Sequence, residues 1–154
     1  MTSRLNYKKL APETYALISA IDQYAKASGL EPILIELVKT RVSQLNHCAY
    51  CIDMHTIDAR NLGETEQRLY TLSAWKEAPF YTARERAALA WAEAVTLLPQ
   101  NDVPDAVYEE ALQHFTEKEL ISLNMAVIAI NSWNRIAVSF RFEAGHYHPK
   151  QRST

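Results

Sequence analysis

The segment from Thr116 to Phe140 restricts the fold more than any other part of this chain of 154 residues. Thr116 and Glu119 have the spacing of a capping box, which predicts that a helix begins at Glu117. Apolar residues then recur along most of the segment, which contains neither glycine nor proline. The sequence therefore predicts a long helix over 117–140 that is central to the fold.

The rest of the chain has the same helical periodicity. Prolines and capping residues begin the predicted segments, and glycines end two of them. Helices are expected over 12–27, from Pro32 to about Asn46, from His47 or Cys48 to Leu62, over 65–74, from Thr82 to Leu98, and from Pro104 or Asp105 onward. A loop is expected over 99–103, where Pro99 follows the preceding helical pattern. The predicted fold is an all-α, single-domain bundle of about six to seven helices with the cysteine pair at the start of a helix.

Length and net charge bear on the number of domains and on the kind of partner. The chain is long enough for one domain, 1–154, with a core over about 12–142 and a tail over 145–154 that is expected to be frayed. A net charge of −2 does not favour a nucleic-acid partner. No segment has the apolar length of a membrane span or of a signal peptide, so a cytoplasmic protein without a membrane partner is predicted.

The two cysteines carry the main chemical signal. Cys48 and Cys51 are the only cysteines of the chain, and His55 follows the second one. On a helix these three residues lie on one face, where the histidine could take a proton from a thiol. A helix N-terminus favours the thiolate, and this spacing allows a disulfide. In a reducing compartment the pair indicates redox or metal chemistry rather than a structural bridge.

Two features around the pair have alternative interpretations. Glu36 lies among apolar residues, where it is either a solvated surface group or a partly buried carboxylate with a raised pKa that can accept a proton. Cys48, Cys51 and His55, with Glu36 or His47 as a fourth ligand, could instead form a zinc site. Because the chain has an ample apolar core that needs no metal, the sequence favours redox chemistry without a bound metal.

The segment around the pair resembles the signature of the alkylhydroperoxidase D family, within the carboxymuconolactone decarboxylase superfamily. The residues that carry the resemblance are Glu36, Lys39, Arg41, Ser43, Asn46, Cys48, Cys51 and His55. The resemblance implies that Cys51 is the thiolate that attacks a peroxide. It also implies that Cys48 closes the disulfide and is the more exposed sulfur, at which a reductant attacks, and that Glu36 and His55 form a proton relay to Cys51.

One position departs from the family pattern. Some members have a histidine between the cysteines as a further relay member, whereas this chain has Tyr50 there and His47 just outside the pair. A tyrosine can donate a hydrogen bond but is a poor base near neutral pH. Tyr50 and His47 are therefore supporting candidates, and the departure implies slower peroxide turnover or a different substrate.

The resulting functional prediction is a thiol-dependent (alkyl)hydroperoxide reductase with an antioxidant role. The first alternative is a disulfide reductase or redox sensor that uses the same thiols, and the second is a zinc-binding structural module. No glycine-rich nucleotide motif is present, so no cofactor is predicted, and the electrons are expected from a thiol or lipoyl protein. The resemblance also implies a homotrimer or homohexamer. Polar residues on the long helix, among them Asn131 and Asn134, are expected to make bonds between helices rather than to take part in catalysis.

Overall fold

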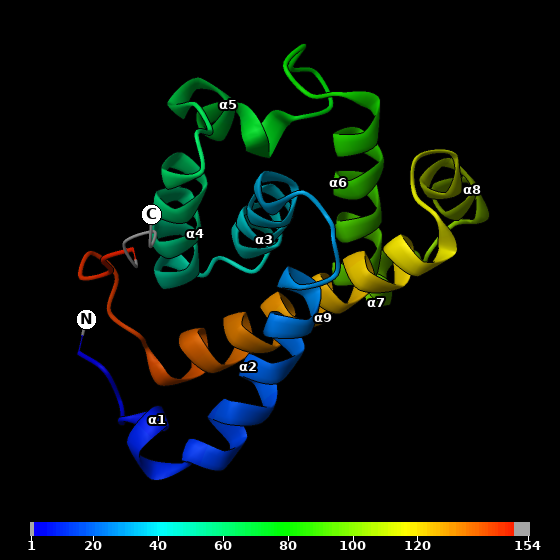
Figure 1. Ribbon diagram of the computed structural model, residues 1–154. Helices are drawn as coiled ribbons and strands as arrows, with labels where there is room; N and C mark the ends of the chain where they lie inside the picture. Colours follow the sequence, from blue (N-terminus) through cyan, green and yellow to red (C-terminus); the bar gives the residue numbers. More distant parts are fainter. Residues whose placement is uncertain (1, 150–154) are drawn as a thin grey trace.

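The computed structural model describes residues 2–149, and every regular element in this range is helical. The elements in chain order are α1 (Tyr7–Leu10), α2 (Pro12–Lys26), α3 (Pro32–Leu45), α4 (Ala49–Asn61), α5 (Glu66–Thr71), the 3₁₀-helix η1 (Leu72–Ala74), α6 (Ala83–Thr96), α7 (Leu98–Asn101), α8 (Asp105–His114) and α9 (Glu117–Phe140). The prediction of an all-α, single-domain protein is confirmed (Figure 1). No helix of this range is long and apolar enough to cross a membrane.

The number of helices in residues 2–149 is higher than predicted. Two elements, α1 and α7, have only four residues each, which is too short for an apolar period to be visible in the sequence. Helix α7 lies partly in the segment that was expected to be a loop, and Pro99 occupies its first turn, where the missing N–H of proline costs nothing. The predicted helix over 65–74 is divided into α5 and η1.

Helix α3 lies near the centre of the bundle and packs against α4, α6 and α9 (Figure 1). Its residues Leu37, Val38 and Val42 are completely buried. The long helix α9 has the predicted bounds and begins with the predicted capping box of Thr116 and Glu119. It packs along both α2 and α3 and also contacts α4, the helix that carries Cys51.

The chain after α9 returns to the side of α4 (Figure 1). The N–H of Gly145 donates to Oδ2 of Asp53 over 2.8 Å, and the hydroxyl of Tyr147 donates to both carboxylate oxygens of Asp58 over 2.8 and 3.0 Å. The sequence predicted a frayed tail over 145–154, but residues 145–149 make hydrogen bonds to α4. The rest of the tail, 150–154, lies outside the described residues.

Candidate redox site

A tight turn between α3 and α4 positions the first cysteine. His47 has a φ of 54°, in the left-handed region, which ends α3 and reverses the chain. The N–H of Cys48 then donates to the carbonyl oxygen of Ser43 over 3.0 Å. Cys48 becomes the N-cap of α4, as the sequence predicted for a cysteine pair at the start of a helix.

The two sulfurs are bonded to each other. Cys48 and Cys51 form a disulfide with their Cα atoms 5.3 Å apart, so the residues that the sequence singled out as a redox pair do meet. Sγ of Cys48 also accepts a hydrogen bond from the N–H of Cys51 over 3.3 Å, the place of an N-cap oxygen in other helices. This N–H and the helix dipole favour a negative charge on the Cys48 sulfur.

Burial of the pair differs from what the resemblance implied. Cys48 and Cys51 are each only 1% exposed, so Cys48 is not the more accessible sulfur in the disulfide form. Both belong to the main apolar cluster formed with α3 and α9 residues such as Val38 and Val127. The physical reason is the N-cap position, which turns the Cys48 side chain back over the first turn of α4 and into the core.

Glu36 and His55 meet across the α3–α4 interface. Nδ1 of His55 donates to Oε2 of Glu36 over 2.6 Å, and the two residues are 5% and 4% exposed. His55 lies on α4 one turn after Cys51, on the same helix face. The bond to Glu36 therefore fixes the imidazole ring and leaves Nε2 as the nitrogen that can exchange a proton.

The pKa of Glu36 lies below its ordinary value, which is opposite to the direction predicted for a buried carboxylate. Burial does raise the pKa, but the hydrogen bond with His55 and the charges of His55, Lys39 and Lys26 lower it by more. The carboxylate therefore stays ionised near neutral pH. Glu36 is therefore a fixed negative charge that orients the His55 ring rather than a group that stores the proton itself.

A buried ion pair lies beside this carboxylate. Lys39 follows Glu36 by one turn on α3, is 0% exposed and is bonded to Oδ1 of Asp22 on α2. Oδ2 of Asp22 also pairs with Lys26 over 3.2 Å. Burial raises the pKa of Asp22, but the two ammonium groups outweigh it and the net pKa is lowered. The sequence had identified Lys39 only as part of a signature, and its partner on α2 was not expected.

A cavity of about 180 Å³ borders the pair on the side of Cys51. Cys51 and His55 both line it, and Cys48 does not. The other lining residues are Tyr15, Ser19, Asp22, Lys26, Tyr50, Met54, Asp58, Trp133, Ala137 and Phe142. A small molecule in the cavity would therefore contact Cys51 and His55 together. Residues of α2 and α9 complete this wall, and no local pattern in the sequence marked them.

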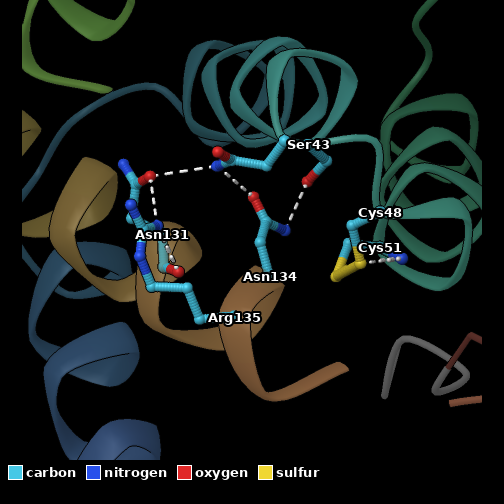
Figure 2. The surroundings of a disulfide bond; sticks show 7 residues. Ser43, Cys48, Cys51, Asn131, Asn134 and Arg135 are labelled. Carbon is cyan, nitrogen blue, oxygen red and sulfur yellow. Dashed lines mark hydrogen bonds between the residues drawn. A yellow bond between two sulfur atoms is a disulfide. The ribbon is translucent and has the colours of Figure 1, made fainter. Parts of the chain in front are cut away.

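Asparagines of α9 hold the turn before the pair, as predicted for the polar residues of that helix. Asn46 donates to Oδ1 of Asn131 over 3.0 Å and to Oδ1 of Asn134 over 2.9 Å. Asn134 in turn donates to Oγ of Ser43 over 3.0 Å, and Figure 2 shows this network beside the disulfide. The backbone carbonyl oxygen of Ser43 accepts the N–H of Cys48. Through Ser43, the network therefore links α9 to the turn that carries Cys48.

Comparisons with known proteins show the family of this chain. The sequence model of the carboxymuconolactone decarboxylase family matches residues 12–94, which is more than half of the chain and includes both cysteines, Glu36 and His55. The chain belongs to the carboxymuconolactone decarboxylase family. The uncharacterized protein YdfG of Bacillus subtilis is 45% identical over 139 residues, which cover 90% of this chain and 95% of YdfG.

Solved structures of similar proteins carry the same fold. A crystal structure of an Agrobacterium tumefaciens protein of unknown function, a candidate antioxidant defence protein AhpD, is 41% identical with a TM-score of 0.91, and the match covers 95% of this chain and 100% of that one. The debrominase Bmp8 is 17% identical with a TM-score of 0.80, covering 90% and 74% of the two chains. The second likeness shows the fold alone, so the chemistry of this family member must be inferred from its site.

Within this family fold, Tyr50 and His47 occupy different surroundings. Tyr50 is half-buried in the cavity wall, edge-on to Phe142 with ring centroids 5.4 Å apart. Burial raises the pKa of Tyr50, with smaller contributions from Tyr15 and Asp53, so its hydroxyl stays protonated near neutral pH. His47 is exposed and does not line the cavity. Tyr50 is therefore placed to donate a hydrogen bond to a molecule in the cavity, and His47 is not.

One group of side chains has the composition of a metal site. Ligand atoms of Glu36, His55 and Asp58 lie within 4.8 Å of one another. The bond of His55 to Glu36 directs the two ligand atoms toward each other, and Asp58 accepts from Tyr147. The zinc set that the sequence suggested needs free thiolates from Cys48 and Cys51, which the disulfide form does not offer.

Proposed function

We propose that this protein is a thiol-dependent hydroperoxide reductase with an antioxidant role, in which Cys51 attacks the peroxide. The observation that carries the proposal is the shared cavity: Cys51 and His55 line it together, while Cys48 is close enough to bond to Cys51. The 41% identity to a candidate antioxidant defence protein AhpD supports the same class of activity.

The reaction begins with the reduced pair. His55, oriented by Glu36, accepts the thiol proton of Cys51, and the thiolate attacks the terminal peroxide oxygen. The O–O bond breaks as the S–O bond forms, and the departing alkoxide takes the proton from His55 to leave as an alcohol. Cys51 is then a sulfenic acid.

The second half of the cycle uses Cys48. The Cys48 thiol loses its proton and its sulfur attacks the sulfur of the Cys51 sulfenic acid. The S–S bond forms as the S–O bond breaks, and the departing hydroxide takes up a proton, equivalent to the one that Cys48 lost, to leave as water. The N–H of Cys51, which donates to the Cys48 sulfur in the disulfide, is placed to stabilise this thiolate before it attacks. The sum is one hydroperoxide and two thiols converted to one alcohol, one water and one disulfide.

The two sulfurs have different roles in this scheme, and cysteine variants test them. Cys51→Ser should abolish both peroxide consumption and sulfenic acid formation, whereas Cys48→Ser should leave a Cys51 sulfenic acid that a dimedone probe traps. Mass spectrometry of the trapped protein gives the site, and circular dichroism checks the fold. Equal loss of the sulfenic acid in both variants would overturn the assignment of roles.

The first alternative, a disulfide reductase or redox sensor, uses the same residues without a peroxide. Thiol exchange by the wild-type protein with no consumption of any hydroperoxide would favour it. The reductant, a thiol or lipoyl protein, and the assembly, a homotrimer or homohexamer, stay predictions from the resemblance. Exposed apolar side chains on α9, Ile121 and Ile128, are compatible with packing between subunits.

A further inference from the structure

A second hollow, the outer groove, adjoins the inner cavity beside Cys51. It has a volume of about 670 Å³ and lies between the N-terminal segment and the segment after α9. Tyr15, Tyr50 and Phe142 line both hollows. We infer that the outer groove binds the chain and the carboxylate of a fatty-acid hydroperoxide, whose O–O group reaches Cys51. The inference rests on the proposed function for the reaction, and on the groove and its charges for the kind of substrate.

The outer groove has a defined wall, because hydrogen bonds fix the N-terminal segment against the end of α9 (Figure 1). The N–H of Ser3 donates to Oε1 of Glu143 over 3.1 Å, and the N–H of Arg4 donates to the carbonyl oxygen of Phe140 over 3.0 Å. The ring of Tyr7 stacks on that of Phe140, with centroids 5.8 Å apart. The groove is thus formed by two segments that are far apart in the sequence and bonded to each other.

Two aromatic pairs separate the groove from the inner cavity. Tyr15 contacts Trp133 with ring centroids 5.0 Å apart, and Tyr50 contacts Phe142 with ring centroids 5.4 Å apart. All four side chains are only partly buried, so their rings have apolar surface left to cover. Because transfer of each CH₂ group from water to an apolar wall is favourable, a hydrocarbon chain is the occupant that suits this partition.

A cation lies on the groove side of the partition. Nζ of Lys8 is 5.0 Å from the centroid of the Tyr15 ring, and Lys8 lines the groove. Glu143 also lines the groove, where its carboxylate accepts the N–H of Ser3. Lys8 is therefore the group with which a carboxylate in the groove can pair.

The charges of the inner cavity exclude a second carboxylate. Asp22 and Asp58 line this cavity together with Lys26. Burial lowers the pKa of Lys26, but the charges of Asp22, Glu36 and Asp58 raise it by more. Since the ammonium group of Lys26 already faces these carboxylates, an entering acid would meet more negative than positive charge. A fatty acid thus enters with its apolar part first and leaves its carboxylate near Lys8.

The volumes suit a long chain rather than a small peroxide alone. A cavity of roughly 150 Å³ holds one benzene molecule, and the inner cavity has about 180 Å³. Only the part of a long chain around the hydroperoxide fits there, and the rest must lie in the groove of about 670 Å³. The reaction at Cys51 is the one described above, and its product is the corresponding hydroxy acid.

Binding of sodium decanoate to the disulfide form tests the groove without any peroxide. Isothermal titration calorimetry should show bound decanoate, and Lys8→Gln should weaken its binding about two- to fivefold, the scale of one exposed ion pair. Lys9→Gln is the matched control, because Lys9 is exposed, follows Lys8 and does not line the groove. Decylammonium has the same chain and the opposite charge, so it should bind more weakly. No binding of decanoate, equal binding of the two ions, or an equal loss in Lys8→Gln and Lys9→Gln would overturn the inference.

A second pair of variants tests the apolar wall. Leu5 lines the groove, whereas Leu10 is 70% exposed and does not. Leu5→Glu should weaken decanoate binding about tenfold, because an apolar contact is lost and a like charge is added. Leu10→Glu should leave the affinity close to that of wild type. Circular dichroism checks the fold, and Leu5→Gln replaces Leu5→Glu if the charge disturbs it. Equal affinities in wild type and the Leu5 variants would contradict the assigned wall.

Turnover separates this inference from the proposed function. The kcat/KM for linoleic acid hydroperoxide, divided by that for tert-butyl hydroperoxide, should fall in Lys8→Gln and Leu5→Glu and should not fall in Lys9→Gln. An unchanged ratio in both groove variants would overturn the assigned substrate. Turnover of tert-butyl hydroperoxide without any binding of decanoate would overturn the inference and leave the proposed function intact. Decanoate binding without turnover of either peroxide would support the groove and refute the proposed function.

Discussion

Glu36→Gln removes one negative charge from the buried contact with His55 and keeps the shape of the side chain. The bond is 2.6 Å long and both residues are almost fully buried. Two unit charges 4 Å apart interact by about 4 kcal/mol at an effective dielectric constant of about 20, which corresponds to about a thousandfold in an equilibrium. This value sets the scale of what the Glu36 charge can contribute to the contact with His55.

The expected loss of rate is smaller than a thousandfold. The glutamine amide can still form one hydrogen bond, and the ammonium groups of Lys39 and Lys26 already offset part of the Glu36 charge. We therefore expect the Cys51 reaction to slow by about ten- to a hundredfold near pH 7, within the range usual for a general base and its partner.

The effect of Glu36→Gln on the Cys51 reaction should depend on pH in one direction. Because the pKa of Glu36 is lowered from 4.5, the wild-type carboxylate stays ionised above that pH and is protonated only below it. The advantage of wild type over Glu36→Gln should thus be present near neutral pH and be lost only as the pH falls below 4.5 and Glu36 is protonated.

The assay is the alkylation rate of Cys51 against pH in a Cys48→Ser background. Glu64→Gln is the matched control, because Glu64 is also a buried glutamate but bonds to Arg68 away from the cavity. Circular dichroism gives the folded fraction of each variant. Superimposable pH profiles for wild type and Glu36→Gln would refute the role of Glu36, and an equal loss in Glu64→Gln would show a general effect of the substitution.

Two further predictions concern stability. Asn134→Ala should lower the free energy of unfolding by about 2 to 3 kcal/mol in urea titrations, because it leaves Asn46 and Ser43 short of partners; a change below about 0.5 kcal/mol would contradict this. Glu119 has its pKa lowered from 4.5 to about 2, first by the backbone N–H of Thr116. Wild type should therefore have a higher free energy of unfolding than Glu119→Gln. This difference should have its largest value above pH 4.5 and should disappear as the pH falls toward 2. Thermal unfolding measures it, and a difference that persists at pH 2 would refute the assignment.

Features that depend on neighbours along the chain could be predicted from the sequence. The bounds of α9 and the capping boxes at Thr82 and Thr116 match the structure, because these patterns involve residues within one or two turns. The position of Cys48 at the start of α4 was predictable for the same reason. The short helices α1 and α7 were not predicted, because four residues are too few to show the hydrophobic period of a helix.

The electrostatic interactions at the site could not be predicted from neighbouring positions along the chain. The sequence suggested a raised pKa for Glu36 from burial alone, whereas the observed direction depends on His55 from α4 and on Lys26 from α2. The ion pair of Lys39 and Asp22 joins α3 to α2. Electrostatic interactions of this kind depend on distances through space, which the order of residues does not contain.

The sequence by itself determined that this chain is helical and that Cys48, Cys51 and His55 share one helix face, because both follow from spacing along the backbone. Only the tertiary structure decided which sulfur borders open space. The cavity wall combines α2, α4, α9 and the segment after α9, and its shape depends on how these separate parts pack. The accessible side of the redox pair is therefore a property of the packing between helices, and the chemistry of the pair is a property of the helix that carries it.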